Sequence, residues 1–433
     1  MIDEQLLDDA EALERADRLG ALLALASAGA RIRSGARAAQ EAGLAQLRPE
    51  GRPRALLVAG HGAAAQAAAV LAALGGQACP VHILRPVSGA APPDVRSDAY
   101  PVGLQWSLPG WAGPADLLVV ASTHGAEAGL VALVERGYQS GCTVVAVAPP
   151  GSPLGDAALQ ARGMPLPYLT SPGSAPSWDR DPDLVRDDPG DLWAMLASLL
   201  SLTHRLALTS SGPEALSAAA DLLDDLAVRC GPMADAYQNP AKSLALRLDG
   251  SLPLIWTDGP LADAASVRFA DMLAEHAARP ALAAALPEAL VRHRGLLESA
   301  VGPGDPSDHD DFFRDRTEEP TQRPAIVLLH RQAADEGEAD PQPQGLPTGS
   351  GVSGRSDGAN GPAIPGESPV PGRPDAGARP SLSRARRLAA LHGTPLYDLA
   401  ATSKEPLTAV AELIALSDFC AVYLGLAAHP WGD

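Results

Sequence analysis

Hydrophobic and polar positions follow two kinds of pattern along most of the chain. Apolar residues recur at helical spacing within residues 3–46, which predicts one or two amphipathic helices. Short uninterrupted apolar runs follow, and each run is typical of a buried β-strand. The runs predicted as strands are 54–60, 81–84, 116–121, 143–148, 252–257 and 324–329, and 395–398 is predicted as a short extended segment.

Longer stretches with helical spacing separate these strands. A strand, a helix and another strand at short intervals form the pattern of a doubly wound parallel sheet. The pattern stops at residues 151–190, which are rich in Pro, Gly, Ser and Asp and are predicted to be a loop. It restarts at 252, so the sequence predicts two α/β halves of similar organisation. The predicted helices are 63–74, 126–136, 191–208, 213–228 (capped by Ser210 or Ser211), 261–279, 383–392 and 406–427.

Residues 331–380 interrupt the second half with ten glycines, nine prolines and no aromatic residue. Such a stretch cannot bury enough apolar surface to offset its ordering entropy, and it is predicted to be disordered. The expected organisation is N-terminal helices in 1–46, a first sheet domain in 47–200, linker helices in 201–240 and a second sheet domain in 241–433.

Composition narrows the class of protein. Of 433 residues, 46% are hydrophobic, which excludes wholesale disorder, and the formal charge is −19. This acidic balance argues against partners such as nucleic acid or an anionic membrane, but backbone amides at a helix N-terminus can still hold a small anion. The sequence shows no uncharged apolar stretch of about 18–20 residues and no secretory leader, so a cytoplasmic protein is expected.

The sequence predicts neither a metal nor a cofactor. Adjacent residues such as Asp308, His309 and Asp310 rarely converge on one ion, so no metal site is assigned to them. A nicotinamide-binding fingerprint would need a glycine at Ala65. The widely spaced cysteines favour buried free thiols in a reducing compartment. They are Cys79, Cys142, Cys230 and Cys420.

The first candidate binding motif is Gly60-His61-Gly62, between a predicted strand and an alanine-rich helix. Two glycines allow an anion to approach the amides of the helix N-terminus closely. The alternative is a tight turn in which glycine only relieves crowding, and the motif by itself favours this alternative.

The second candidate is the turn from Ser122 to Glu127, which also follows a strand and precedes a helix. The hydroxyls of Ser122 and Thr123, together with the amides around Gly125, are suited to phosphate. The alternative is ordinary helix capping by Ser122 or Thr123.

The second half offers three further polar candidates. Glu275 and His293 come from nearby segments and are suited to work as general base and general acid, or else are solvated surface residues. Lys242, one of only two lysines, follows Asn239 and Pro240, where an ordinary lysine at a helix start is the alternative.

In this order the motifs resemble the bifunctional phosphoglucose/phosphomannose isomerase family, built from two sugar-isomerase (SIS) domains, and in particular its divergent TobH-like branch. The resemblance covers most of the chain outside 331–380 and is most specific at 239–256 and 413–426. It implies two SIS-type, three-layered αβα domains with a phosphosugar-binding cleft between them. It also implies a homodimer, because a second subunit often completes the cleft in this family.

Residue by residue, the resemblance implies that Glu275 transfers a proton between C1 and C2 of a hexose 6-phosphate through an enediol. It implies that His293 opens the sugar ring, although His293 stands about two positions late. The phosphate turns correspond to residues 60–64, without the family's serine, and to Ser122, Thr123, Gly125 and Glu127 with altered spacing.

The family's lysine near the C-terminus has no counterpart in this sequence. The resulting hypothesis is an aldose–ketose isomerase acting on glucose or mannose 6-phosphate. The alternative is a non-catalytic SIS-type protein that binds phosphosugars or regulates their metabolism. The altered phosphate turns, the late histidine and the missing lysine favour this alternative.

Overall fold

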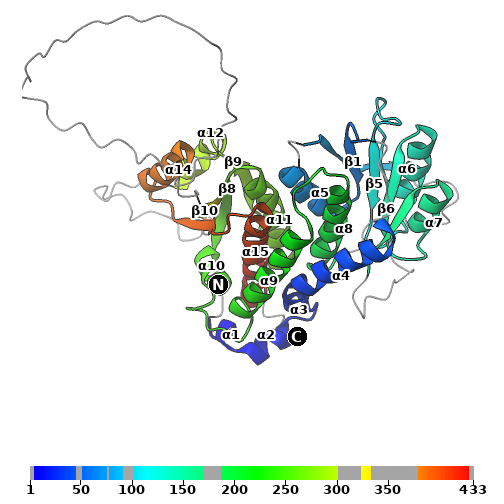
Figure 1. Cartoon of the computed structure of the whole chain (residues 1–433). Coiled ribbons are helices and arrows are strands. Elements are labelled where there is room, and N and C mark those ends of the chain that lie inside the picture. The colour runs from blue at the N-terminus through cyan, green and yellow to red at the C-terminus, as the bar shows by residue number, and fades with distance from the viewer. Residues whose placement is uncertain are drawn as a thin grey trace, which may run out of the picture.

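The computed structural model shows two α/β lobes side by side, with the N-terminal helices packed along one side of the pair (Figure 1). Residues 308–310 lie outside the described residues, as does the predicted disordered stretch 331–380 apart from its ends. The structure describes residues 4–44, 51–75, 78–90, 102–169, 187–300, 323–332 and 379–428.

The first lobe is built on a five-stranded parallel sheet with the strand order β2-β1-β5-β6-β7. Its central strands β1 and β5 are buried along their whole length, as expected where helices cover both faces of a parallel sheet. A separate antiparallel hairpin is formed by β3 and β4. The strands are β1 (Leu56–Ala59), β2 (Val81–Leu84), β3 (Val87–Ala90), β4 (Val102–Gln105), β5 (Leu117–Ala121), β6 (Thr143–Ala148) and β7 (Met164–Pro167).

Helices cover both faces of this sheet, with α6 and α7 on the outer face and α5 and α8 on the inner face (Figure 1). The prediction of a loop over 151–190 is wrong at α7 and β7. Ser152 caps α7 by accepting from the Gly155 amide at 3.3 Å, with Pro153 as the first helical residue. Two prolines are tolerated in β7 because it is an edge strand. The helices are α5 (Gly62–Gly75), α6 (Ala128–Gln139), α7 (Pro153–Gln160) and α8 (Asp191–Arg205).

The second lobe has a four-stranded parallel sheet in the order β11-β10-β8-β9, again with helices on both faces. The prediction of two doubly wound parallel-sheet units is therefore confirmed. Its strands are β8 (Ser251–Asp258), β9 (Leu282–Ala285), β10 (Arg323–Arg331) and β11 (Leu396–Ala401). Its helices are α10 (Pro240–Leu248), α11 (Pro260–Ala277), α12 (Ala289–Arg292), α13 (Arg294–Ala300), α14 (Pro380–Leu391) and α15 (Pro406–Ala428).

The N-terminal helices and α9 join the lobes. Helix α4 packs against α8 of the first lobe and against α9, which in turn packs against α15 of the second lobe. The N-cap of α9 is Gly212, without a side-chain cap, rather than the predicted Ser210 or Ser211. These helices are α1 (Glu4–Asp8), α2 (Ala10–Ala16), α3 (Ala21–Ala26), α4 (Ala28–Glu41) and α9 (Pro213–Arg229).

The inner helices of both lobes share one apolar core, with α15 at its centre (Figure 1). Within the described ranges, α15 alone has the length and apolar composition of a membrane span, and its apolar window is completely buried. The core thus accounts for this composition. Gly425 lets α15 pack tightly on α11, because a Cβ there would lie 1.9 Å from the His276 carbonyl oxygen.

A buried ion pair lies within this core. Nε of Arg268 donates to Oδ2 of Asp418 at 2.8 Å, Nη2 lies 2.8 Å from the same oxygen, and the two side chains are 5% and 0% exposed. Arg268 also donates from Nη1 to Gln66 of α5 and from Nη2 to the Pro189 carbonyl at 2.7 Å. Burial raises the pKa of Asp418 to about 6, although Arg268 lowers it. One side chain of the second lobe therefore holds two segments of the first.

Replacing Asp418 tests this pair. Asp418→Asn leaves the Arg268 charge buried without a counter-charge, so we expect the free energy of unfolding to fall by about 3–5 kcal/mol in denaturant titrations. The control is Asp225→Asn on the exposed face of α9, for which we expect a change within about 0.5 kcal/mol. Equal small changes in both variants would contradict the structural role of the pair.

Lys242 is a fully buried structural residue rather than an ordinary lysine at a helix start. Its ammonium donates to the carbonyls of Leu7 at 2.5 Å and of Pro232 and Ala234 at 2.8 Å. It also lies 5.4 Å from the ring centre of Tyr423. The side chain thereby ties α1 to α10 and to the loop that follows α9.

The two lysines provide a matched pair of variants. Lys242→Met leaves three carbonyls without their charged donor, so we expect a loss of about 3 kcal/mol or more in the free energy of unfolding. Lys404→Met removes the same side chain from an exposed position and should change stability by less than about 0.5 kcal/mol. Denaturant titration measures both, and a Lys242→Met variant as stable as wild type would refute the assignment.

Candidate functional site

The two turns predicted to bind phosphate meet at the carboxyl ends of the neighbouring strands β1 and β5. The chain leaves β1 toward the inner face, through α5, and leaves β5 toward the outer face, through α6 (Figure 1). Such a point of divergence creates a crevice in which open α/β sheets bind ligands. Gly60 is needed here, because a Cβ would lie 2.6 Å from the Ala121 carbonyl oxygen.

Glu127 joins the two turns from a fully buried position. Its Oε1 lies 3.0 Å from Nε2 of His61 in the first turn, and its two carboxylate oxygens lie 2.6 and 2.8 Å from the Ser122 hydroxyl, which donates to this carboxylate. Burial favours a higher pKa for Glu127, but the hydrogen bonds from His61 and Ser122 hold that pKa below its usual value. Glu127 is therefore placed to fix the two turns relative to each other, through His61 in the first turn and Ser122 in the second.

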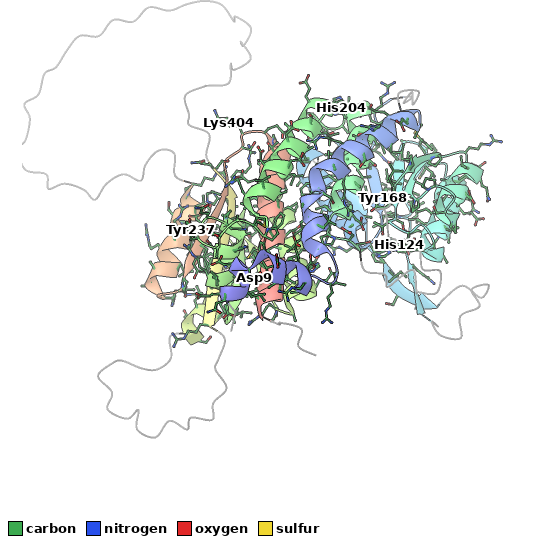
Figure 2. All side chains as sticks on the ribbon, turned by 90° about the horizontal axis from the view of Figure 1, so that it is seen from below. Asp9, His124, Tyr168, His204, Tyr237 and Lys404 are labelled. Atoms are coloured by element: carbon green, nitrogen blue, oxygen red, sulfur yellow. The ribbon has the colours of Figure 1, made fainter. Side chains whose placement is uncertain are left out.

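The amides of the second turn point inward onto Ser122. Its hydroxyl oxygen accepts from the backbone N–H of His124 at 3.0 Å and of Gly125 at 2.6 Å. Gly125 has φ +71°, and a Cβ there would lie 2.5 Å from the Ser152 hydroxyl. Figure 2 shows where His124 lies in the first lobe. Ser122 and Gly125 thus shape the turn, and Thr123 is the residue of this turn that reaches across the crevice.

A carboxylate from a distant segment occupies the resulting cradle. Asp187 Oδ2 accepts from the backbone N–H of Ala63 at 2.6 Å, and Oδ1 accepts from the Thr123 hydroxyl at 2.7 Å. Gly62 has φ +54°, and a Cβ there would lie 1.9 Å from Asp187 Oδ2. We call Gly62, Ala63 and Thr123 the anion cradle. No local sequence pattern indicated Asp187, which lies in the stretch predicted as loop.

A cavity of about 210 Å³ extends from the cradle to the second lobe. Its first-lobe wall includes Gly62, Ala63 and residues 187–189, and its second-lobe wall is formed by α11, including Glu275. Glu275 is exposed, and the cavity therefore has Gly62 and Ala63 of the anion cradle on one side and this carboxylate on the other. The remaining polar wall residues are Gln66, Arg268 and His276, of which the sequence pointed only to His276, as the neighbour of Glu275.

The structure separates the two predicted catalytic residues. His293 is buried, and its Nδ1 accepts from the Trp256 indole N–H at 2.9 Å. This contact belongs to the apolar cluster on the outer face of the second sheet, whereas α11 with Glu275 covers the inner face. Burial lowers the pKa of His293. Glu275, but not His293, shares a cavity with Gly62 and Ala63 of the first predicted phosphate turn.

A larger cavity of about 450 Å³ lies between α4, α8 and α9. Its described lining is mainly apolar with basic residues such as Arg37 and His204, and it includes none of the predicted site residues. We therefore place the candidate site at the smaller interlobe cavity. In the part of the chain that the structure describes, no group of three His, Cys, Asp or Glu residues is arranged to hold a metal.

Comparisons with known proteins agree with this architecture. Residues 237–340 match the bacterial phospho-glucose isomerase C-terminal SIS domain. A candidate phosphosugar isomerase from Silicibacter pomeroyi DSS-3 superposes with a TM-score of 0.54 at 14% identity, covering 95% of this chain and 98% of its own. Another from Clostridium difficile 630 gives 0.50 at 10% identity, covering 95% and 93%.

No curated protein matches the chain significantly. The two solved structures share the fold of this chain, and the family match lies within its second lobe. Together these findings place a SIS-domain match at residues 237–340 and show that the chain as a whole has the fold of these two structures.

Glu127 makes the stability of the first lobe pH-dependent. Because its folded-state pKa lies below the ordinary value of 4.5, the folded protein binds fewer protons than the unfolded chain between the two values. The stabilisation from the carboxylate is complete above pH 4.5 and is lost as the pH falls through the folded-state pKa. We therefore expect wild type to lose stability more steeply below pH 4.5 than Glu127→Gln.

Denaturant titrations at a series of pH values measure this difference. The control is Glu135→Gln on the exposed face of α6, whose pH profile should follow that of wild type. Parallel profiles for wild type and Glu127→Gln would show that the buried carboxylate does not have the lowered pKa.

Proposed function

We propose that this protein binds a phosphosugar in the interlobe cavity and interconverts its aldose and ketose forms. The observation that carries the proposal is that Gly62 and Ala63 of the anion cradle and the exposed side chain of Glu275 line one cavity of about 210 Å³. The resemblance suggests glucose or mannose 6-phosphate as substrate and membership of the TobH-like branch of the bifunctional isomerases.

In the proposed reaction the phosphate binds at the anion cradle, through the Ala63 amide and the Thr123 hydroxyl. Binding energy at this non-reacting group positions the sugar carbons against Glu275. The carboxylate removes the C2 proton of the open-chain aldose, the electron pair forms the C1–C2 double bond of an enediol, and a proton moves to O1. As the C2 carbonyl forms from the enediol, the O2 hydroxyl releases its proton to solvent, which supplied the proton at O1, and C1 takes up the proton held by Glu275.

His293 has no part in this scheme, because its ring is buried against Trp256 on the other face of the sheet. The homodimer and the cytoplasmic location remain predictions. The non-catalytic alternative receives no specific support, since Glu275 lies exposed on the cavity wall.

Glu275→Gln tests the proposal. The variant keeps the shape of the side chain but removes its basicity, so we expect kcat on glucose or mannose 6-phosphate to fall by about 10²–10⁴. Phosphosugar affinity should stay within a few-fold of wild type. A coupled isomerase assay and calorimetric titration measure the two quantities.

The control is Glu298→Gln on α13, an exposed carboxylate away from the cavity lining. Undiminished turnover in Glu275→Gln would remove Glu275 from the mechanism. Phosphosugar binding by wild type without turnover would instead support the non-catalytic alternative.

A further inference from the structure

The carboxylate of Asp187 occupies the anion cradle as a bound anion would. One of its oxygens accepts from an amide at the N-terminus of α5, and the other accepts from the Thr123 hydroxyl of the second turn. Amides at a helix start and a neighbouring hydroxyl are the donors that proteins use for phosphate. The anion therefore comes from the protein's own chain.

Residues 187–189 are held by the N-terminal helix α4 and by α11 of the second lobe. Arg31 of α4 binds Asp188 at 2.9 Å, and Arg268 of α11 binds the Pro189 carbonyl at 2.7 Å. A carboxylate presented next to its site by a fixed backbone has a high effective concentration there. An incoming phosphate must compete with that tethered group.

Helix capping alone does not account for this contact. Asp187 is 124 residues from Ala63 and 64 residues from Thr123 along the chain, so it is no local cap of α5. The glycine at position 62 leaves the space that the carboxylate fills. A purely structural carboxylate would affect only stability, whereas an occupant of the binding site would also weaken the binding of another anion.

We propose that Asp187 is a tethered competitor that sets the affinity of the cradle for phosphate. A phosphosugar binds when its phosphate displaces the carboxylate from the Ala63 amide and the Thr123 hydroxyl. A phosphomonoester, which carries up to two charges, displaces it more readily than a singly charged sugar acid does. This inference rests on the proposed function, because it identifies the same cradle as the phosphate subsite.

The test is calorimetric titration of Asp187→Ala and Asp187→Asn with inorganic phosphate, in a phosphate-free buffer at constant ionic strength. We expect Asp187→Ala to lower the dissociation constant for phosphate by about tenfold or more. In this variant the Ala63 amide and the Thr123 hydroxyl are available for charge-assisted hydrogen bonds to phosphate. The dissociation constant of Asp187→Asn should lie between those of Asp187→Ala and wild type. Asp187→Asn serves as the test variant if Asp187→Ala does not fold.

Asp271→Asn is the matched control, because it removes one negative charge from α11 of the cavity region without emptying the cradle. Its phosphate affinity should stay close to that of wild type. If Asp271→Asn gained as much phosphate affinity as Asp187→Ala, the loss of any nearby negative charge would explain the gain, and the inference would be overturned. Thermal melts supply a second readout: phosphate should raise the melting temperature of Asp187→Ala more than that of wild type.

The inference and the proposed function can fail separately. Unchanged phosphate affinity in both folded Asp187 variants would overturn the inference, even if wild type isomerises hexose phosphates. Tighter phosphate binding in Asp187→Ala without isomerase activity in wild type would support the inference as a statement about the cradle and would count against the proposed reaction.

Discussion

The buried guanidinium of Arg268 is the constraint on which the arrangement of the lobes depends. Removing a charge from water is costly unless a counter-charge and hydrogen bonds replace the solvent, and Asp418 supplies the counter-charge from α15. The remaining hydrogen bonds go to Gln66 and to the Pro189 carbonyl, both in the first lobe. The ion pair therefore couples the core of the second lobe to the walls of the interlobe cavity.

This coupling explains how the chemistry can be divided between two similar units. The first lobe contributes backbone amides and a hydroxyl at the point where β1 and β5 diverge, and these groups are suited to an anion. The second lobe contributes Glu275 from the C-terminal end of α11. This end of the helix is far from the carboxyl end of β8, the strand that precedes α11. Neither lobe holds both groups, so the cavity combines them because the contacts of Arg268, together with the shared apolar core, hold the lobes against each other.

The buried strands and long helices could be predicted from sequence because their apolar periodicity is local. The cavity position of Glu275 was consistent with the family resemblance, whereas the burial of His293 depends on Trp256, 37 residues away. Lys242 and Asp187 were harder, since their partners include Leu7 and Ala63, which are distant in sequence. Residue type and spacing do not indicate such tertiary contacts. The stretch around Asp187 is rich in Pro, Gly, Ser and Asp, and this composition predicts only a loop.

The net charge of −19 means that the protein as a whole repels an anion that approaches the cradle. At physiological salt the overall field of the protein is screened beyond about 8 Å, so the proposed phosphosugar would be held by short-range donors rather than by long-range attraction. An empty cradle would leave the Ala63 amide and the Thr123 hydroxyl without the partner they have in Asp187. If phosphate displaces Asp187, one anion replaces another at the cradle and the donors stay paired before and after binding, while the displaced carboxylate remains tethered nearby through Asp188 and Pro189 and continues to compete.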